Sequence, residues 1–134
     1  MTRFLLVLFV LIGATRGIQA QNLVDLEGLK PPEEFDNVHV EPISDGVQAT
    51  SFVIWIKEGV KAHYHREHAE HIYILAGTGN MTLDNEVFGV KAGDFVRIPP
   101  ESVHAVTVTS DIPLKVLSVQ TPQFLGQDRH WVDQ

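Results

Sequence analysis

The hydrophobic positions from residue 38 onward follow the pattern of short β-strands. Apolar and β-branched residues gather in short runs, and turn-forming pairs such as Asp45-Gly46, Asp84-Asn85 and Pro99-Pro100 separate them. The runs cover residues 38–43, 48–57, 60–65, 70–76, 79–84, 86–91, 94–99, 103–109 and 114–121. No stretch of the sequence keeps a helical apolar period over a useful length. Short strands with turn residues between them, at intervals of about 8–12 positions, indicate an all-β sandwich or barrel.

The first 20 residues have a different pattern, that of a secretory signal peptide. Arg3 precedes an unbroken apolar run from Phe4 to Ile12, and Ala20 offers a small residue at the cleavage position. The uncharged stretch 4–15 holds 12 residues, whereas a membrane-spanning helix needs about 20. We therefore expect residues 1–20 to be removed on export to the periplasm or the medium, with no membrane segment left.

The rest of the chain divides into three parts. Residues 21–37 contain Pro31-Pro32, which breaks any helix, and are expected to form an N-terminal arm. Residues 38–121 hold all the predicted strands and are expected to form one barrel domain. Residues 122–134 carry Trp131 and are expected to wrap the barrel or a neighbouring subunit.

Composition narrows the classes of function. The chain of 134 residues has 17 acidic and 10 basic residues, and its formal net charge is −7. Nucleic acids and anionic membranes both require a basic face on the protein, so neither is an expected partner. The chain has no cysteine, which excludes disulfides, a thiol nucleophile and a thiolate metal site, and which fits an oxidising compartment. A small molecule is the partner that we expect.

The candidate chemistry lies in three histidines and one glutamate. His63 and His65 are two apart on a predicted strand, so both rings project from one face. Glu70 begins the next strand and shares its face with Ile72, and His104 lies on a strand further along the chain. Three imidazoles and a carboxylate in an apolar interior are costly when they are unpaired. A divalent metal removes that cost, because it neutralises the carboxylate and uses the imidazole lone pairs.

The spacing of these residues is more specific than any one of them. A lone strand histidine is more often a hydrogen-bonded group than a ligand, and a single HxH pair occurs by chance. Here the chain reads Gly59-x3-His63-x-His65-x4-Glu70-x6-Gly77 and then Gly93-x5-Pro99-x4-His104. These two motifs, within residues 38–121, resemble those of the cupin superfamily. Three positions depart from the family pattern: Gly59 lies two residues late, Glu101 replaces a glycine and Val108 replaces an asparagine.

The resemblance implies a double-stranded β-helix, the jelly-roll barrel of cupins, with a metal in its lumen and often a homodimeric assembly. Within this pattern His63, His65, Glu70 and His104 are the metal ligands. Nitrogen and oxygen ligands do not distinguish among Mn, Fe, Ni, Co, Zn and Cu. Four ligands would close a tetrahedral zinc site, whereas a six-coordinate metal would keep two positions open for substrate.

Three hypotheses of function follow from such a site. The first is an exported metalloenzyme whose small, oxygen-rich or anionic substrate chelates the metal, with oxygenase, isomerase, decarboxylase or cyclase chemistry. The second is a non-catalytic barrel that binds a sugar, a sugar acid or another small ligand, and the third is a structural metal in an interaction module. Tyr73, Arg97 and Glu101 lie near the motif residues and are candidates for proton transfer, whereas His68 is expected to be a solvated turn residue.

Overall fold

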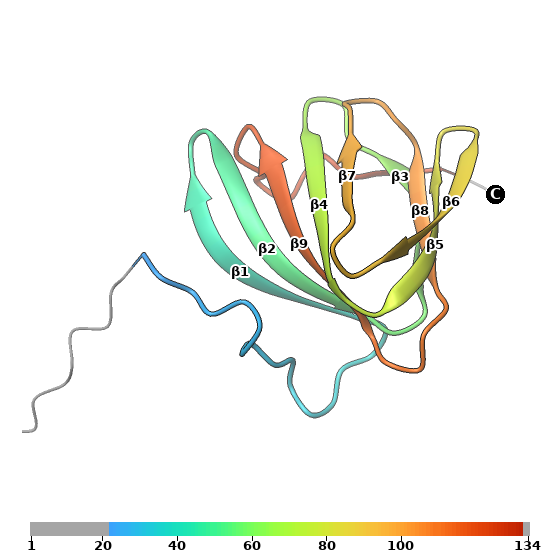
Figure 1. Cartoon of the computed structure of the whole chain (residues 1–134). Coiled ribbons are helices and arrows are strands. Elements are labelled where there is room, and N and C mark those ends of the chain that lie inside the picture. The colour runs from blue at the N-terminus through green and yellow to red at the C-terminus, as the bar shows by residue number, and fades with distance from the viewer. Residues whose placement is uncertain (1–21, 133–134) are drawn as a thin grey trace, which may run out of the picture.

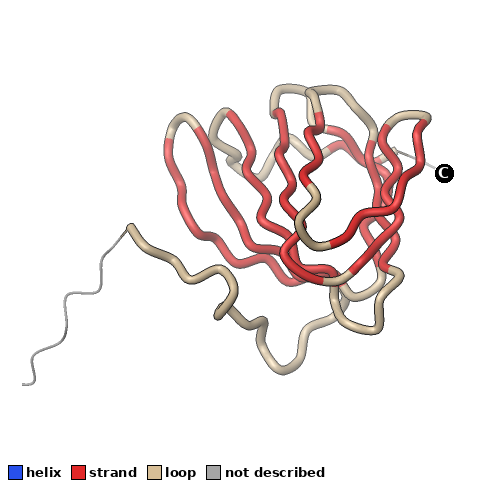
Figure 2. The backbone as a smooth tube through the Cα atoms, in the orientation of Figure 1, coloured by secondary structure: helices blue, strands red, loops and turns tan. Residues whose placement is uncertain are grey.

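The regular secondary structure of the described residues is all β-strand, joined by loops (Figure 2). The computed structural model describes residues 22–132, so the predicted signal peptide lies outside the described residues. The strands are β1 (Val38–Gly46), β2 (Ala49–Ile56), β3 (Gly59–Tyr64), β4 (Ala69–Ala76), β5 (Thr78–Leu83), β6 (Glu86–Lys91), β7 (Phe95–Ile98), β8 (His104–Val108), β9 (Leu114–Thr121) and β10 (His130–Trp131). In residues 22–132 there is no helix with the length and apolar character to cross a bilayer.

The strands form two five-stranded antiparallel sheets that face each other (Figure 1). One sheet has the order β1-β2-β9-β4-β7 and the other has the order β10-β3-β8-β5-β6. The chain crosses between the sheets at every connection except β1–β2 and β5–β6, so strands that are distant in sequence become neighbours. This is the topology of a jelly-roll, and the predicted all-β double-stranded β-helix is confirmed.

The alternation of residues along β4 shows how the core is placed. Ile72 and Ile74 are 9% and 1% exposed and point between the sheets, where Ile98 of β7 joins them. Tyr73 projects from the outer face and is 42% exposed. Full burial of an isoleucine side chain stabilises the fold by about 1.5–3 kcal/mol. The same alternation places the Glu70 side chain on the inner face, where it is buried.

The N-terminal arm lies outside the barrel (Figure 1) and is tied to one sheet. Trp55 and Lys115 project from the outer face of β2 and β9, yet they are 4% and 8% exposed. The Lys115 ammonium donates hydrogen bonds to the backbone carbonyls of Leu26 (2.6 Å) and Leu29 (2.9 Å), and it lies 5.4 Å from the centre of the Trp55 ring. Burial lowers the pKa of Lys115. These bonds hold the arm against the strand that it crosses.

The C-terminal tail pairs with its own barrel. β10 extends the second sheet beside β3, with His130 opposite Tyr64 and Trp131 opposite His63. The described part of the tail therefore lies against its own barrel. A contact of the tail with a neighbouring subunit stays a prediction. This pairing brings tail residues to the end of β3, where two of the candidate ligands lie.

Two of the turns with left-handed backbone conformations are at Gly77, at the end of β4 opposite to Glu70, and at Glu101, next to the site. Gly77 has a φ of +78°, and a Cβ atom there would lie 2.9 Å from the carbonyl oxygen of Pro113, so glycine is required. Glu101 has a φ of +67° although it carries a side chain. It stands where the cupin pattern has glycine, and the turn keeps its conformation at a cost of roughly 1–2 kcal/mol. The Glu101 N–H donates a 2.6 Å hydrogen bond to the carbonyl of His65, which ties this turn to the ligand segment.

A substitution at this turn should stabilise the protein. We expect Glu101→Gly to have a free energy of unfolding about 1 kcal/mol higher than Glu101→Ala, because glycine adopts a positive φ without steric strain. Glu101→Ala is the matched control, since it removes the side chain and keeps the strain. Urea unfolding of the two variants measures the difference, and equal stabilities would contradict the strain at this position.

Candidate metal centre

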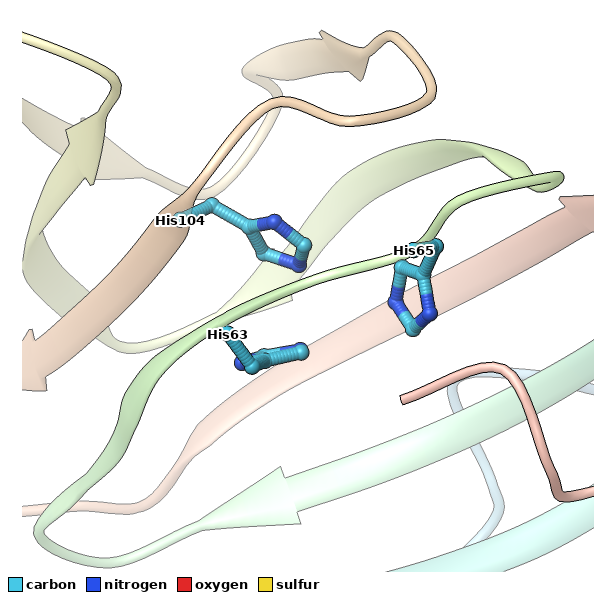
Figure 3. Close-up of side chains that lie close together, drawn as sticks. All are labelled: His63, His65 and His104. Carbon is cyan, nitrogen blue, oxygen red and sulfur yellow. The ribbon is translucent and has the colours of Figure 1, made fainter. Parts of the chain in front are cut away.

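Three buried histidines lie together between the sheets (Figure 3). His63 lies near the end of β3, His65 follows that strand, and His104 begins β8 directly opposite His63. The three residues are between 1% and 5% exposed, and one nitrogen of each lies within 4.8 Å of the others. Glu70 comes from β4 of the other sheet, with Oε2 3.5 Å from His65 Nε2 and 3.3 Å from His104 Nε2. The structure therefore brings together the four residues for which metal ligation is predicted.

Backbone carbonyls set the tautomer of all three histidines. The Nδ1 atom of His63 lies 2.8 Å from the carbonyl oxygen of Lys61, and that of His104 lies 3.0 Å from the carbonyl oxygen of Ser102. The Nδ1 atom of His65 is hydrogen-bonded to the carbonyl of Asp128. A carbonyl oxygen can only accept, so each Nδ1 carries a proton. Each neutral ring therefore keeps its lone pair on Nε2.

The Nε2 atoms and the Glu70 carboxylate form a cluster of buried acceptors. Within residues 22–132, no hydrogen-bond partner reaches Nε2 of His65 or of His104. Buried acceptors that face one another without a donor destabilise the fold, and a bound cation would remove that cost. Imidazole nitrogens and a carboxylate are a common donor set for divalent first-row metals, and histidine ligands usually donate their other N–H to an acceptor, as here. The residues present therefore fit a divalent metal ion, and three of them, the buried histidines, could hold one on their own.

Charges within the cluster set its protonation. Burial raises the pKa of Glu70, but the neighbouring His104 and His65 rings and the hydrogen bond from Ser118 outweigh it and hold that pKa well below the usual range. Ser118 Oγ lies 2.5 Å from Glu70 Oε1. Burial, and then the nearby His104, lower the pKa of His63 to about 4, so this ring is neutral at pH 7. Burial also opposes protonation of His65, but the nearby Glu70 carboxylate and the bond to the Asp128 carbonyl raise the pKa of this ring. Metal binding at Nε2 would therefore compete with a proton on His65.

Asp128, in the C-terminal tail, organises the loop between the ligands His65 and Glu70. Its carboxylate accepts hydrogen bonds from the backbone N–H groups of residues 66–68 at 2.9–3.1 Å. Its backbone carbonyl is the group that binds His65 Nδ1. Burial raises the pKa of Asp128, but the hydrogen bonds that it accepts prevail and hold that pKa well below its usual range. The tail therefore orients a candidate metal ligand.

His68 belongs to the same network and is not a solvated turn residue. Its side chain is buried, with 5% of the residue exposed. Nδ1 lies 2.5 Å from a carboxylate oxygen of Asp128, and Nε2 lies 2.9 Å from the carbonyl oxygen of Gln123. The expectation of solvent exposure is wrong because both acceptors come from the tail, more than fifty residues further along the chain.

Loss of the Asp128 carboxylate should weaken metal binding. The Asp128 carboxylate fixes the 66–68 loop and thereby the position of the Asp128 carbonyl that orients His65. We expect Asp128→Asn to lower metal affinity by about 10–100-fold, because groups that orient a histidine ligand typically have effects of that size. The matched control is Asp94→Asn, which removes a carboxylate that holds the exposed Lys91 turn instead. Competition with a coloured chelator measures both affinities. An Asp128→Asn protein that binds metal as tightly as the wild type would contradict this role.

A cavity of about 400 Å³ adjoins the centre. Aliphatic side chains of both sheets form its walls, among them Ile54, Ile72, Met81, Ile98, Val106 and Leu114. His63, Glu70 and His104 also line it. Val40 of β1 and Trp131 of β10 line the cavity and are 43% and 57% exposed, so it opens where these strands end their sheets.

The three side chains predicted for proton transfer do not line this cavity. Tyr73 and Arg97 project from the outer face of β4 and β7, since strand alternation places their neighbours in the core. Glu101 is exposed on its turn. None of the three therefore reaches the cavity, and a proton-transfer role for Tyr73, Arg97 and Glu101 has no support from their placement. The lining residues that sequence reasoning missed are Arg129 and Trp131, because no local pattern indicates that the tail returns to the site.

Comparison with known proteins establishes the family. The chain matches the Cupin domain family over residues 51–120 and belongs to it. An uncharacterized protein of Methanocaldococcus jannaschii is 44% identical over 66 residues, which cover 49% of this chain and 53% of that protein. The chain thus spans about half the length of this relative. The predicted membership of the cupin superfamily is confirmed.

Solved structures with the same fold include proteins of different kinds. A conserved uncharacterized protein with a double-stranded β-helix domain from Klebsiella pneumoniae has a TM-score of 0.70 and 16% identity, over 84% of this chain and 97% of that one. Streptomyces Pac13, a nucleoside dehydratase, has a TM-score of 0.62 and 18% identity, over 73% of this chain and 82% of that one. At these identities the likeness shows the fold alone.

Proposed function

We propose that the protein is a metal-dependent cupin that acts on a small organic molecule. His63, His65, Glu70 and His104 would hold one divalent cation, and the adjoining cavity would hold the molecule. The observation that carries this proposal is the set of three buried imidazoles, all with Nδ1 bonded to a backbone carbonyl, of which His65 and His104 have Nε2 within 3.5 Å of the Glu70 carboxylate. A structural role for the ion is less favoured, because the ligands line an open cavity and not a closed core.

The residues around the cavity have roles of their own beside those of a bound cation. A bound cation would supply Lewis-acid chemistry, the polarisation of a carbonyl or the stabilisation of an enolate or carboxylate. Ser118 holds Glu70 in place, the backbone carbonyls hold the imidazoles, and the aliphatic walls exclude water from the bound molecule. Such a site suits isomerase, decarboxylase, cyclase or oxygenase chemistry.

The second candidate is a non-catalytic barrel that captures a small ligand. One observation favours it: besides the ligands His63, Glu70 and His104, the charged side chains lining the cavity within residues 22–132 are Lys61 and Arg129. Proton transfer in the cavity would have to use Lys61 or a metal ligand. Turnover therefore separates the two candidates.

Metal titration of the stripped protein tests the proposal. We expect calorimetry to give one divalent ion per chain, and screening with small molecules to give binding or turnover that disappears in the stripped protein and in Glu70→Gln. A folded wild type that binds no divalent metal would overturn the proposal. Product formed by loaded protein selects the enzyme, and saturable binding without product selects the capture barrel.

We further propose that the protein works outside the cytoplasm. The supporting features are the pattern of residues 1–20 and the absence of cysteine from the sequence. Protein recovered from the periplasm or medium should begin at Gln21, and a chain recovered from the cytosol with Met1 still present would contradict export. The homodimer implied by the family stays a prediction, which light scattering can test.

A further inference from the structure

The tail places a cation beside the candidate metal centre. Trp131 lies opposite His63 in the pairing of β10 with β3, and its ring centre is 5.3 Å from that of His63. Arg129 is two residues earlier, so strand alternation turns it to the same side, and it lines the cavity. Its guanidinium carbon lies 5.8 Å from the centre of the Trp131 ring.

This cation has no carboxylate partner within the described part of the chain, where no acidic group lies within ion-pair distance of Arg129. Apart from the candidate metal ligands, the other charged side chain at the cavity is Lys61, which is also a cation. Both occur in a chain whose net charge is −7. Cations gathered at the mouth of a low-dielectric cavity raise the local concentration of anionic ligands.

The remaining polar side chain of the cavity is already engaged. Asn37 donates to the carbonyl of Gly59 at 2.7 Å and accepts from the N–H of Glu58 at 2.8 Å. The rest of the wall is largely aliphatic, with Ile54, Ile72 and Val106 facing the space. Hydroxyl groups of a sugar would be buried there without partners, at a cost of about 1–3 kcal/mol each. The cavity therefore suits an apolar body, and its cations suit an anionic head.

On the basis of the proposed function, we propose that the substrate or ligand is a small monocarboxylate with an apolar body, and that Arg129 is the residue that selects for its carboxylate. The carboxylate lies between Arg129 and the metal centre, and the hydrocarbon part fills the aliphatic cavity. This specificity excludes the sugar acids that the sequence alone left open.

Three probes of similar ring size separate the contribution of the carboxylate charge from that of the apolar body. Cyclohexanecarboxylate has the apolar body and the charge, cyclohexanecarboxamide lacks the charge, and glucuronate has the charge on a polyhydroxylated ring. Calorimetry with zinc-loaded wild type should show cyclohexanecarboxylate binding at least about tenfold more tightly than either of the others. The carboxamide loses a charge-assisted hydrogen bond, and glucuronate buries hydroxyl groups without partners, and each effect is worth about that ratio.

Arginine variants then test the residue. Arg129→Gln should weaken cyclohexanecarboxylate binding about tenfold and leave zinc affinity unreduced, and Arg129→Lys should retain part of the binding. Arg97→Gln is the matched control on the outer face and should bind as the wild type does.

The outcomes distinguish this inference from the proposed function. If folded wild type fails to bind zinc, the proposed function fails and the inference fails with it. If zinc binds, the inference alone is overturned when cyclohexanecarboxylate does not bind, when glucuronate binds more tightly, or when Arg129→Gln binds the carboxylate as the wild type does.

Discussion

The His104→Ala variant is expected to bind divalent metal more than about 100-fold more weakly than the wild type. Loss of a group that orients a metal ligand costs about 10–100-fold in affinity, and loss of the ligand itself should exceed the upper end of that range. His104 lies directly opposite His63 across β3 and β8, so its removal opens one side of the acceptor cluster. The truncation enlarges an existing cavity, so the barrel should still fold.

Competition with a coloured chelator measures the affinity, and circular dichroism confirms the fold. His71→Ala is the matched control, because His71 adjoins Glu70 in sequence but stacks on Phe95 at the outer face, with ring centres 5.7 Å apart. If the His104→Ala protein bound metal as tightly as the wild type, His104 would not be a metal ligand. Equal losses in both variants would indicate non-specific binding to histidines.

Saturating divalent metal is expected to raise the Tm of the stripped wild type by on the order of 15 °C. The ligands come from segments at β3, β4 and β8 that only the folded barrel brings together, so the metal binds the native state alone. Binding at about 1,000 times Kd contributes roughly 4 kcal/mol. For a domain of this size, 1 kcal/mol corresponds to about 4 °C in Tm.

Thermal unfolding with metal and with an added chelator measures this shift. Glu70→Gln and His104→Ala should show little of it, whereas Arg97→Gln on the outer face should show all of it. An unchanged Tm in wild type that calorimetry shows to be saturated would mean that the metal does not bind at a site formed by folding.

The strands could be predicted because their signals are local. Alternation of apolar and polar residues, broken by turn residues, is visible within each run, and it also places His63 and His65 on one face. Glu70 could be added because it begins the following strand. His104, by contrast, required the family pattern, since nothing local indicates that β8 returns beside β3.

The rest of the site depends on contacts between distant segments. Asp128 caps a loop about sixty residues before it, and Arg129 and Trp131 reach the cavity through a two-residue strand too short to carry a pattern. Lys115 would be expected in solvent on the outer face, yet arm carbonyls nearly ninety residues away bury its ammonium. His68 was mispredicted for the same reason, because its partners lie in the tail.

An anomalous difference map from crystals of the zinc-loaded protein tests the central claim most directly. The account predicts one peak about 2.0–2.1 Å from Nε2 of His63, His65 and His104, with Glu70 as the neighbouring oxygen ligand. A peak elsewhere, or a loaded crystal in which these Nε2 atoms bind no metal, would contradict it.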